Sequence, residues 1–138
     1  MASIRKEISI DARPADVWAA LSDFGAVHQR LAPGFVTNTR LEADDIRVVT
    51  FVNGAVAREV LVDMDQETRR LVYTVVEGPL GSTHHNATAQ VFGDGDGRSR
   101  FVWIADVLPD DVAGTVGALM EQGIGVIKRT LESQATRA

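Results

Sequence analysis

The first part of the chain alternates apolar and polar side chains and then changes to a helical pattern. Isoleucines alternate there with charged and hydroxyl side chains, which predicts a half-exposed strand over Ser3–Ile10. Pro14 then begins a short helix that ends near Asp23, because a first helical turn tolerates proline. A second short helical stretch, Ala26–Leu31, ends at the turn that starts at Pro33.

The middle of the chain is a series of short β-rich runs separated by turn residues. Every connection between them is short enough for an antiparallel meander, so no parallel crossover is needed. Asn53-Gly54 stands between two of the runs and predicts a two-residue type I′ hairpin, because both central residues of that turn need positive φ. The predicted strands cover Val36–Glu42, Ile46–Val52, Ala55–Asp63, Arg70–Val76, Thr83–Phe92 and Arg100–Val107.

A long amphipathic helix is predicted at the end of the chain. It begins at Pro109, and two aspartates place negative charge in its first turn, where the helix dipole favours it. Apolar residues then recur at three- and four-residue spacings, which places them on one face. At about 1.5 Å per residue the helix would extend on the order of 30 Å, enough to lie across the whole sheet. Its apolar positions are Val112, Val116, Leu119, Met120, Gly123, Ile124, Ile127 and Leu131.

Length, charge and cysteine content narrow the classes of function. A chain of 138 residues with 45% hydrophobic residues fits a single domain, residues 1–138, with a sizeable core. The formal net charge of -5 offers no source for counterion release, so nucleic acid is not expected as a partner. The chain has no cysteine, signal peptide pattern or membrane-spanning apolar run. A soluble protein of the cytoplasm is therefore expected.

Two segments carry a resemblance to a known superfamily. The predicted order of elements, together with IDARPADVWAALSDF at residues 10–24 and RSRFVWIADVLPDD at residues 98–111, resembles the START/birch-pollen-allergen (SRPBCC) superfamily. The bacterial polyketide cyclase/dehydrase-like branch is the most similar. The resemblance implies an α+β helix-grip fold, in which a curved seven-stranded antiparallel sheet wraps around the C-terminal helix. It also implies a cavity for an apolar or amphipathic ligand, without defining a reaction.

Neither a cofactor nor a metal is expected. The plant allergen-like branch has a glycine-rich loop between its second and third strands, where this chain has Glu42–Asp45, so a plant-hormone receptor is disfavoured. The lack of cysteine and of paired histidine ligands argues against the iron-binding oxygenase members. His84 and His85 are adjacent in a predicted strand and point to opposite faces, which disfavours chelation of one metal by both.

Three strand residues are candidates for contact with a ligand. His85 shares its predicted face with residues that suit a buried position, and an imidazole with an ordinary pKa of about 6.5 can move protons near neutral pH. A purely structural role is the competing interpretation of His85. Tyr73 offers a phenol to orient a ligand carbonyl or hydroxyl, or packs only as a core side chain. The resemblance favours Trp103 as a cavity wall that also has a ring N–H to donate, and core packing is a second interpretation that is compatible with the first.

One charged position on the fourth predicted strand faces the concave side of the sheet. The two-residue hairpin sets Val48 opposite Glu59 and turns Arg58 to the other face. An isolated charge on the concave face is costly unless it is paired or functional. Glu59 is the favoured inward residue, because Val48, Thr50 and Leu61 would share its face. Arg58 remains the alternative.

Two residues of the predicted C-terminal helix, Met120 and Ile124, complete the ligand-binding set. Gly117 and Gly123 lie on or near the same apolar stripe, although a glycine inside a helix costs about 1 kcal/mol relative to alanine. Their missing side chains would either let the sheet approach the helix or leave space for a ligand beneath Met120 and Ile124. The flexible thioether of Met120 suits an irregular ligand.

Together these features predict a domain that binds a hydrophobic or aromatic small molecule, polyketide-, lipid- or isoprenoid-like, between the sheet and the last helix. Cofactor-independent cyclase or dehydratase chemistry would use His85 to move protons, with Tyr73 or Glu59 polarising or accepting. One alternative is a lipid carrier without catalysis. Another is a module that binds a partner protein, resembling the chaperone-associated or toxin-like members. The oligomeric state is left open.

Overall fold

The structure, a computed structural model, describes residues 2–137. Along the chain, one strand is followed by two short helical segments, six strands and a long helix, which is the predicted order. The strands are β1 (Ala2–Ile10), β2 (Val36–Ala43), β3 (Ile46–Phe51), β4 (Val56–Asp65), β5 (Arg70–Glu77), β6 (His84–Gly93) and β7 (Ser99–Leu108). The helical segments are α1 (Pro14–Ser22), the π-type turn η1 (Val27–Leu31), the 3₁₀ turn η2 (Asp110–Val112) and α2 (Ala113–Arg137).

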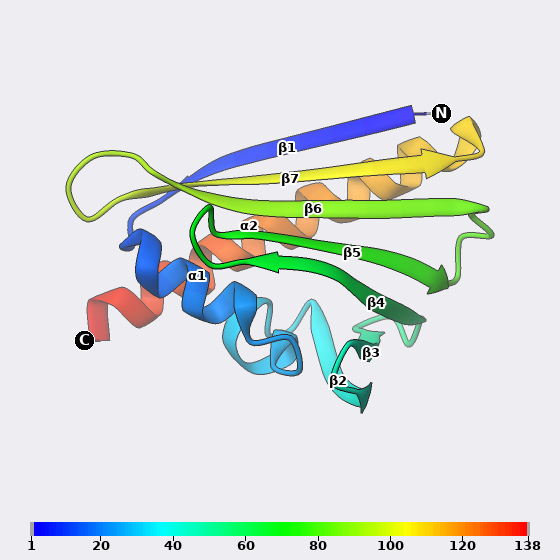
Figure 1. Ribbon diagram of the computed structural model, residues 1–138, viewed down its shortest axis with the longest axis horizontal. Helices are drawn as coiled ribbons and strands as arrows, with labels where there is room; N and C mark the ends of the chain where they lie inside the picture. The colour runs from blue at the N-terminus through cyan, green and yellow to red at the C-terminus, as the bar shows by residue number, and fades with distance from the viewer. Residues whose placement is uncertain (1, 138) are drawn as a thin grey trace.

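The strands form one antiparallel sheet in the order β1-β7-β6-β5-β4-β3-β2. The strands from β2 to β7 make a meander, and β1 joins it by pairing with β7. Figure 1 shows α2, in orange to red, lying lengthwise against one face of the sheet. It contacts β1 and β7 there, and η1 packs against both α2 and β2. This arrangement is the predicted α+β helix-grip fold.

The core lies between the sheet and α2. The period-two alternation of β6 and the three- and four-residue stripe of α2 bury the side chains that face each other. Trp18 of α1 belongs to this core, and its ring N–H donates to Gln66 Oε1 at 2.6 Å. None of the helices described is long and apolar enough to cross a membrane. The buried residues of α2 include Val116, Met120, Ile124, Ile127 and Leu131.

The turn between β3 and β4 differs from the predicted two-residue hairpin. The Gly54 N–H donates to the Phe51 carbonyl at 2.9 Å, and the Phe51 N–H donates to the Ala55 carbonyl at 2.8 Å. Residues 52–54 therefore form a three-residue connection. Gly54 has a φ of 88°, and the Asn53 side-chain oxygen accepts a hydrogen bond from the Ala55 N–H at 3.0 Å. A turn followed by a left-handed glycine is the usual form of a three-residue hairpin loop.

The longer turn moves the pairing of β3 with β4 by one residue. Val48 lies opposite Arg58, and Arg47 lies opposite Glu59, whereas the predicted register set Val48 opposite Glu59. Successive side chains of a strand point to opposite faces, so the shift exchanges the β3 residues that accompany Glu59. Arg47 lies on the face of Glu59, and the predicted grouping of Glu59 with Val48 and Thr50 was wrong.

A buried hydrogen bond ties the connection between β1 and α1 to the sheet. The Ser99 side chain, at the start of β7, is fully buried, and its hydroxyl donates to the Ala12 carbonyl at 2.6 Å. A buried carbonyl that loses its donor retains the cost of desolvation without the compensating bond. Ser99 therefore holds the segment that leads into α1.

We expect Ser99→Ala to lower the free energy of unfolding by about 1–3 kcal/mol, because the Ala12 carbonyl stays buried without its donor. Ser3→Ala is the matched control, since the Ser3 hydroxyl donates to Asp106 at the same 2.6 Å but is exposed. Its loss should cost less than about 0.5 kcal/mol. Urea denaturation followed by circular dichroism measures both variants. Equal losses would contradict a special role for Ser99.

Candidate functional site

A cavity of about 120 Å³ lies between the concave face of the sheet and α2. Residues of η1, of β3 to β7 and of α2 line it, and most of their side chains are apolar. The cavity is therefore suited to the apolar part of a ligand, with a small number of polar groups to orient it. The polar lining residues are Arg47, Glu59, Tyr73, His85 and Trp103.

Small residues make room for this cavity. Ala89 and Ala105 line it from the sheet, and Gly123 lines it from α2. A Cβ atom added at Gly123 would lie 3.1 Å from the Phe35 ring and 3.2 Å from the Trp103 ring. Gly123 therefore lets both rings approach the helix backbone. This close approach is one of the two reasons that the sequence offered for a glycine in the apolar stripe.

The cavity adjoins a wider mouth of about 350 Å³. The β3–β4 turn lines the mouth through Asn53, the loop between β5 and β6 through Pro79, and the beginning of α2 through Thr115. Glu59 and His85 line both the inner cavity and the mouth. We call these two residues the neck, because they are the polar residues among those that the two spaces share.

Arg47 and Glu59 form an ion pair within the cavity lining. Arg47 Nε donates to Glu59 Oε1 at 2.8 Å, and the two side chains are 6% and 9% exposed. Arg47 Nη1 also donates to the Phe24 carbonyl at 3.3 Å. The guanidinium lies 4.2 Å from the centroid of the Phe24 ring and 5.0 Å from that of Tyr73. These contacts satisfy a charge that would otherwise be costly to bury, and they fix Glu59 and the Tyr73 ring.

Sequence reasoning did not single out Arg47. The predicted two-residue turn at Asn53-Gly54 set Val48 opposite Glu59, so Arg47 had no apparent relation to the concave face. The three-residue turn sets opposite charges directly across from each other. Cross-strand pairs of opposite charge stabilise a sheet, and this complementarity was the signal in the sequence that favoured the observed register.

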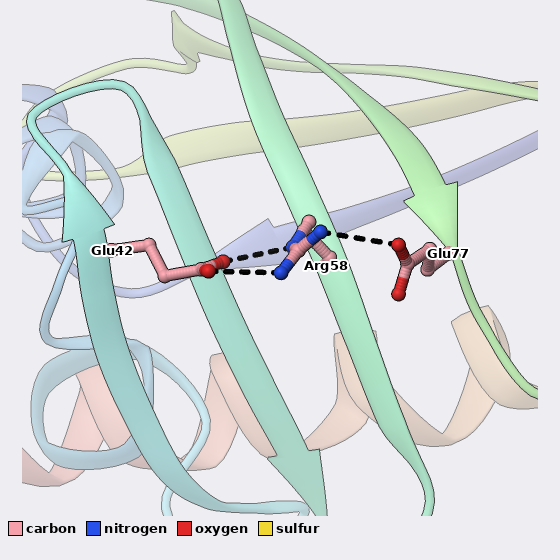
Figure 2. Close-up of polar contacts among 3 residues, drawn as sticks. All are labelled: Glu42, Arg58 and Glu77. Carbon is pink, nitrogen blue, oxygen red and sulfur yellow. Dashed lines mark hydrogen bonds and ion pairs between the residues drawn. The ribbon is translucent and has the colours of Figure 1, made fainter.

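Arg58 lies on the outer face of the sheet (Figure 2). Its Nε and Nη2 donate to the two carboxylate oxygens of Glu42 at 2.8 Å each, and its Nη1 donates to Glu77 at 3.1 Å. Because β3 lies between β2 and β4, the contact with Glu42 passes across β3. Arg58 is thus engaged away from the cavity, and of the two candidates Glu59 is the inward residue.

Tyr73 is buried in the wall of the inner cavity. Burial raises the pKa of its phenol far above the ordinary value, and the nearby Glu59 carboxylate adds to this rise. Arg47 and Trp103 lower the pKa of Tyr73, but by less than burial and Glu59 raise it. The phenol therefore keeps its proton at every pH of interest and is available as a hydrogen-bond donor.

His85 is half-buried at the neck, whereas His84 is exposed, as expected for adjacent strand residues that point to opposite faces. Burial lowers the pKa of His85 below its ordinary 6.5, and the neighbouring His84 lowers it further. The imidazole is therefore neutral near neutral pH. A neutral imidazole has one N–H to donate and one nitrogen lone pair to accept a proton.

The two neck residues belong to one row across the sheet. Glu59 pairs with Val75 of β5, and the β5–β6 ladder runs as far as Thr74 with Asn86. The next position of that register sets Val75 beside His85. Glu59 and His85 are therefore two strands apart on the same face. Among the residues described, no group of three or more His, Asp or Glu side chains is arranged to hold a metal ion.

The remaining predicted ligand-binding residues divide into two groups. Trp103 and Met120 line the cavity from β7 and α2. Ile124 is only 3% exposed but lies outside the cavity lining, so the structure places it in the packed core. The residues of the predicted set that the structure brings together around the cavity are Glu59, Tyr73, His85, Trp103 and Met120.

Solved structures of other proteins share the fold. A START superfamily protein from Mycobacterium smegmatis is 14% identical, with a TM-score of 0.75 over 98% of this chain and 97% of that chain. The Zhui aromatase/cyclase from Streptomyces sp. R1128 is 18% identical, with a TM-score of 0.74 over 99% and 94%. Norcoclaurine synthase from Thalictrum flavum, in complex with dopamine and hydroxybenzaldehyde, is 22% identical, with a TM-score of 0.74 over 99% and 87%. These similarities show a common fold.

Comparison at the level of sequence identifies the family. No curated protein matches the chain. The sequence model of the family described as polyketide cyclase / dehydrase and lipid transport matches residues 1–138, which is the whole chain. The match confirms the predicted SRPBCC membership and its polyketide cyclase-like branch. The chain belongs to the polyketide cyclase / dehydrase and lipid transport family.

Proposed function

We propose that this protein binds a small hydrophobic or aromatic molecule between the concave face of the sheet and α2. The observation that carries the proposal is a largely apolar cavity of about 120 Å³ inside an otherwise close-packed core. An engineered apolar cavity of about 150 Å³ in another protein binds benzene, so the inner cavity has room for approximately one ring. Burial of an apolar ligand surface supplies the driving force.

The mouth extends the space available to the same ligand. It adds about 350 Å³ beyond the neck, and typical ligand pockets occupy about 300–1,000 Å³. A ligand of two or three fused rings, or a ring with an alkyl chain, fits this combination. The structural relatives support an aromatic ligand, since one is an aromatase/cyclase and another was solved with dopamine and hydroxybenzaldehyde.

Filling the inner cavity should weaken binding. We expect Ala105→Leu to weaken the binding of 2-naphthol by at least about tenfold, because its isobutyl group would occupy the ligand volume. Ala87→Leu is the matched control, since Ala87 is the equally buried cross-strand partner of Ala105 but does not line the cavity. Isothermal titration calorimetry measures both. Equal binding by the parent protein and Ala105→Leu would place the ligand elsewhere.

We further propose that His85 and Tyr73 perform acid–base chemistry on a bound carbonyl compound. The neutral imidazole of His85 takes a proton from the carbon next to the carbonyl, while the Tyr73 phenol donates a hydrogen bond to the carbonyl oxygen. The electron pair of the broken C–H bond forms the C=C bond of an enolate, and the carbonyl π electrons move to the oxygen that the Tyr73 hydrogen bond stabilises. Return of the proton from His85 to carbon completes the cycle. Positioned general acids and bases typically accelerate such steps by ~10²- to 10⁴-fold. Cyclisation and dehydration of a polyketone use the same step.

The catalytic role of His85 has a direct test in the exchange of hydrogen at the α-carbons of 2-tetralone in D₂O. We expect the parent protein to accelerate the exchange, and His85→Gln to retain affinity but lose at least about tenfold in rate, because glutamine cannot take up the proton. Nuclear magnetic resonance follows the loss of the α-proton signal. Unchanged exchange in the variant would remove His85 from the mechanism. Binding without any acceleration by the parent protein would instead indicate a carrier.

The lowered pKa of His85 predicts a pH dependence of stability. The unfolded imidazole binds a proton near pH 6.5, whereas the folded one does so only at lower pH, so the unfolded state holds more protons between the two values. The free energy of unfolding should therefore fall as the pH drops from about 7.5 to about 5.5. His85→Gln should flatten this dependence in urea denaturation. The carboxyl pKa values of Glu7, Asp65 and Glu132 are also lowered, but these groups change the free energy of unfolding at lower pH than His85 does. An unchanged slope would contradict burial of His85.

A further inference from the structure

The buried ion pair in the cavity wall retains hydrogen-bonding capacity that the protein does not use. Within the part of the chain that the structure describes, Glu59 accepts through Oε1, and no hydrogen bond reaches Oε2. Arg47 donates through Nε and Nη1, and no hydrogen bond leaves Nη2. In the same described part, the only fully buried side-chain nitrogen or oxygen without a partner is Nδ1 of His28. Oε2 and Nη2 therefore keep accessible surface.

That surface belongs to the cavity, because Arg47 and Glu59 both line it and both side chains are otherwise buried. The pair thus presents one free acceptor and one free donor to the same enclosed space. Its two formal charges cancel. A group that complements this arrangement is uncharged, donates one hydrogen bond and accepts another, and these are the properties of a hydroxyl.

We propose that the Arg47–Glu59 pair is the polar recognition site of the cavity and selects an uncharged ligand with a phenolic or enolic hydroxyl over a carboxylate. The inference rests on the proposed binding function and names the ligand class. The hydroxyl donates to Glu59 Oε2 and accepts from Arg47 Nη2. A carboxylate ligand would bring a second negative charge beside Glu59 in a site of low dielectric, while the guanidinium is already neutralised. An ether lacks the donor and leaves the carboxylate oxygen unpaired.

Three ligands with one bicyclic skeleton test this selectivity by calorimetry at about pH 7.5, where naphthoate is ionised. We expect 2-naphthol to bind at least about tenfold more tightly than 2-methoxynaphthalene and 2-naphthoate, because only its hydroxyl both donates to and accepts from the pair. Equal affinities, or a preference for naphthoate, would overturn the inference while leaving the binding function intact. Failure of all three to bind would contradict the proposed function itself.

Variants of the pair assign the selectivity to these two residues. Arg47→Met combined with Glu59→Leu removes both charges at similar volume, and such replacements of a buried pair are commonly tolerated. The double variant should bind 2-naphthol and 2-methoxynaphthalene within about twofold of each other, because the hydroxyl has lost its partners. The control is Arg58→Met combined with Glu42→Leu, which removes the outer pair of Figure 2 and should leave the preference unchanged. Preserved selectivity in the Arg47 and Glu59 double variant would refute the assignment.

A single substitution should reverse the preference between 2-naphthol and 2-naphthoate. Glu59→Gln leaves the Arg47 charge in the cavity wall without its counter-ion, so this variant should bind 2-naphthoate more tightly than 2-naphthol. Circular dichroism establishes first that the variant folds. If it does not fold, the double variant decides the question. A folded Glu59→Gln protein that still prefers 2-naphthol would contradict the proposed role of the carboxylate.

Discussion

Arg47 and Glu59 lie opposite each other on β3 and β4 with less than a tenth of either side chain exposed. Removal of one member of a buried pair typically costs about 3–5 kcal/mol, so these two charges strongly favour the register in which they meet. A slip of one residue would set Val48 opposite Glu59, turn the Arg47 and Glu59 side chains to opposite faces and break the pair. The three-residue turn closed by Gly54 is the connection that permits this register. The polar chemistry of the cavity thus depends on one cross-strand pair.

The rest of the cavity follows from side-chain size and burial. Alanines on the concave face leave space between the sheet and α2, and Gly123 on α2 lets the Phe35 and Trp103 rings pack against the helix backbone. Burial holds the proton on Tyr73 and disfavours a proton on His85, so near neutral pH the lining contains a phenol that donates and an imidazole that accepts. In the binding function proposed here, apolar surface supplies affinity and these few polar groups supply orientation. The fold of the polyketide cyclase / dehydrase and lipid transport family positions both the apolar surface and the polar groups of the cavity.

The order of elements could be predicted from the sequence, and so could the inward face of β6, where apolar and polar residues alternate from Asn86 to Val91. In β5, Val72 and Val76 interrupt the alternation, but Leu71, Tyr73 and Val75 still mark one face. Tyr73 and His85 were therefore assigned to the correct face. The β3–β4 register could not be predicted from the sequence, because Asn-Gly suits a two-residue turn and also a three-residue turn with a left-handed glycine. Both faces of Ile46–Phe51 carry apolar residues, so the apolar pattern does not show which face points inward. Arg47 was therefore not assigned to the cavity. Ile124 shows another limit: a helical stripe predicts burial but not which buried residues border a void.

The most direct test of a ligand site between the sheet and α2 uses the methyl groups of the three methionines as probes. Met120 lines the cavity, whereas Met64 lies on β4 outside the lining. With ¹³C-methyl-labelled methionine and 2-naphthol bound, the account predicts intermolecular nuclear Overhauser effects from the naphthalene protons to the Met120 methyl and none to Met64. Effects confined to Met64, or no effect at Met120 from a ligand that calorimetry shows to be bound, would contradict it.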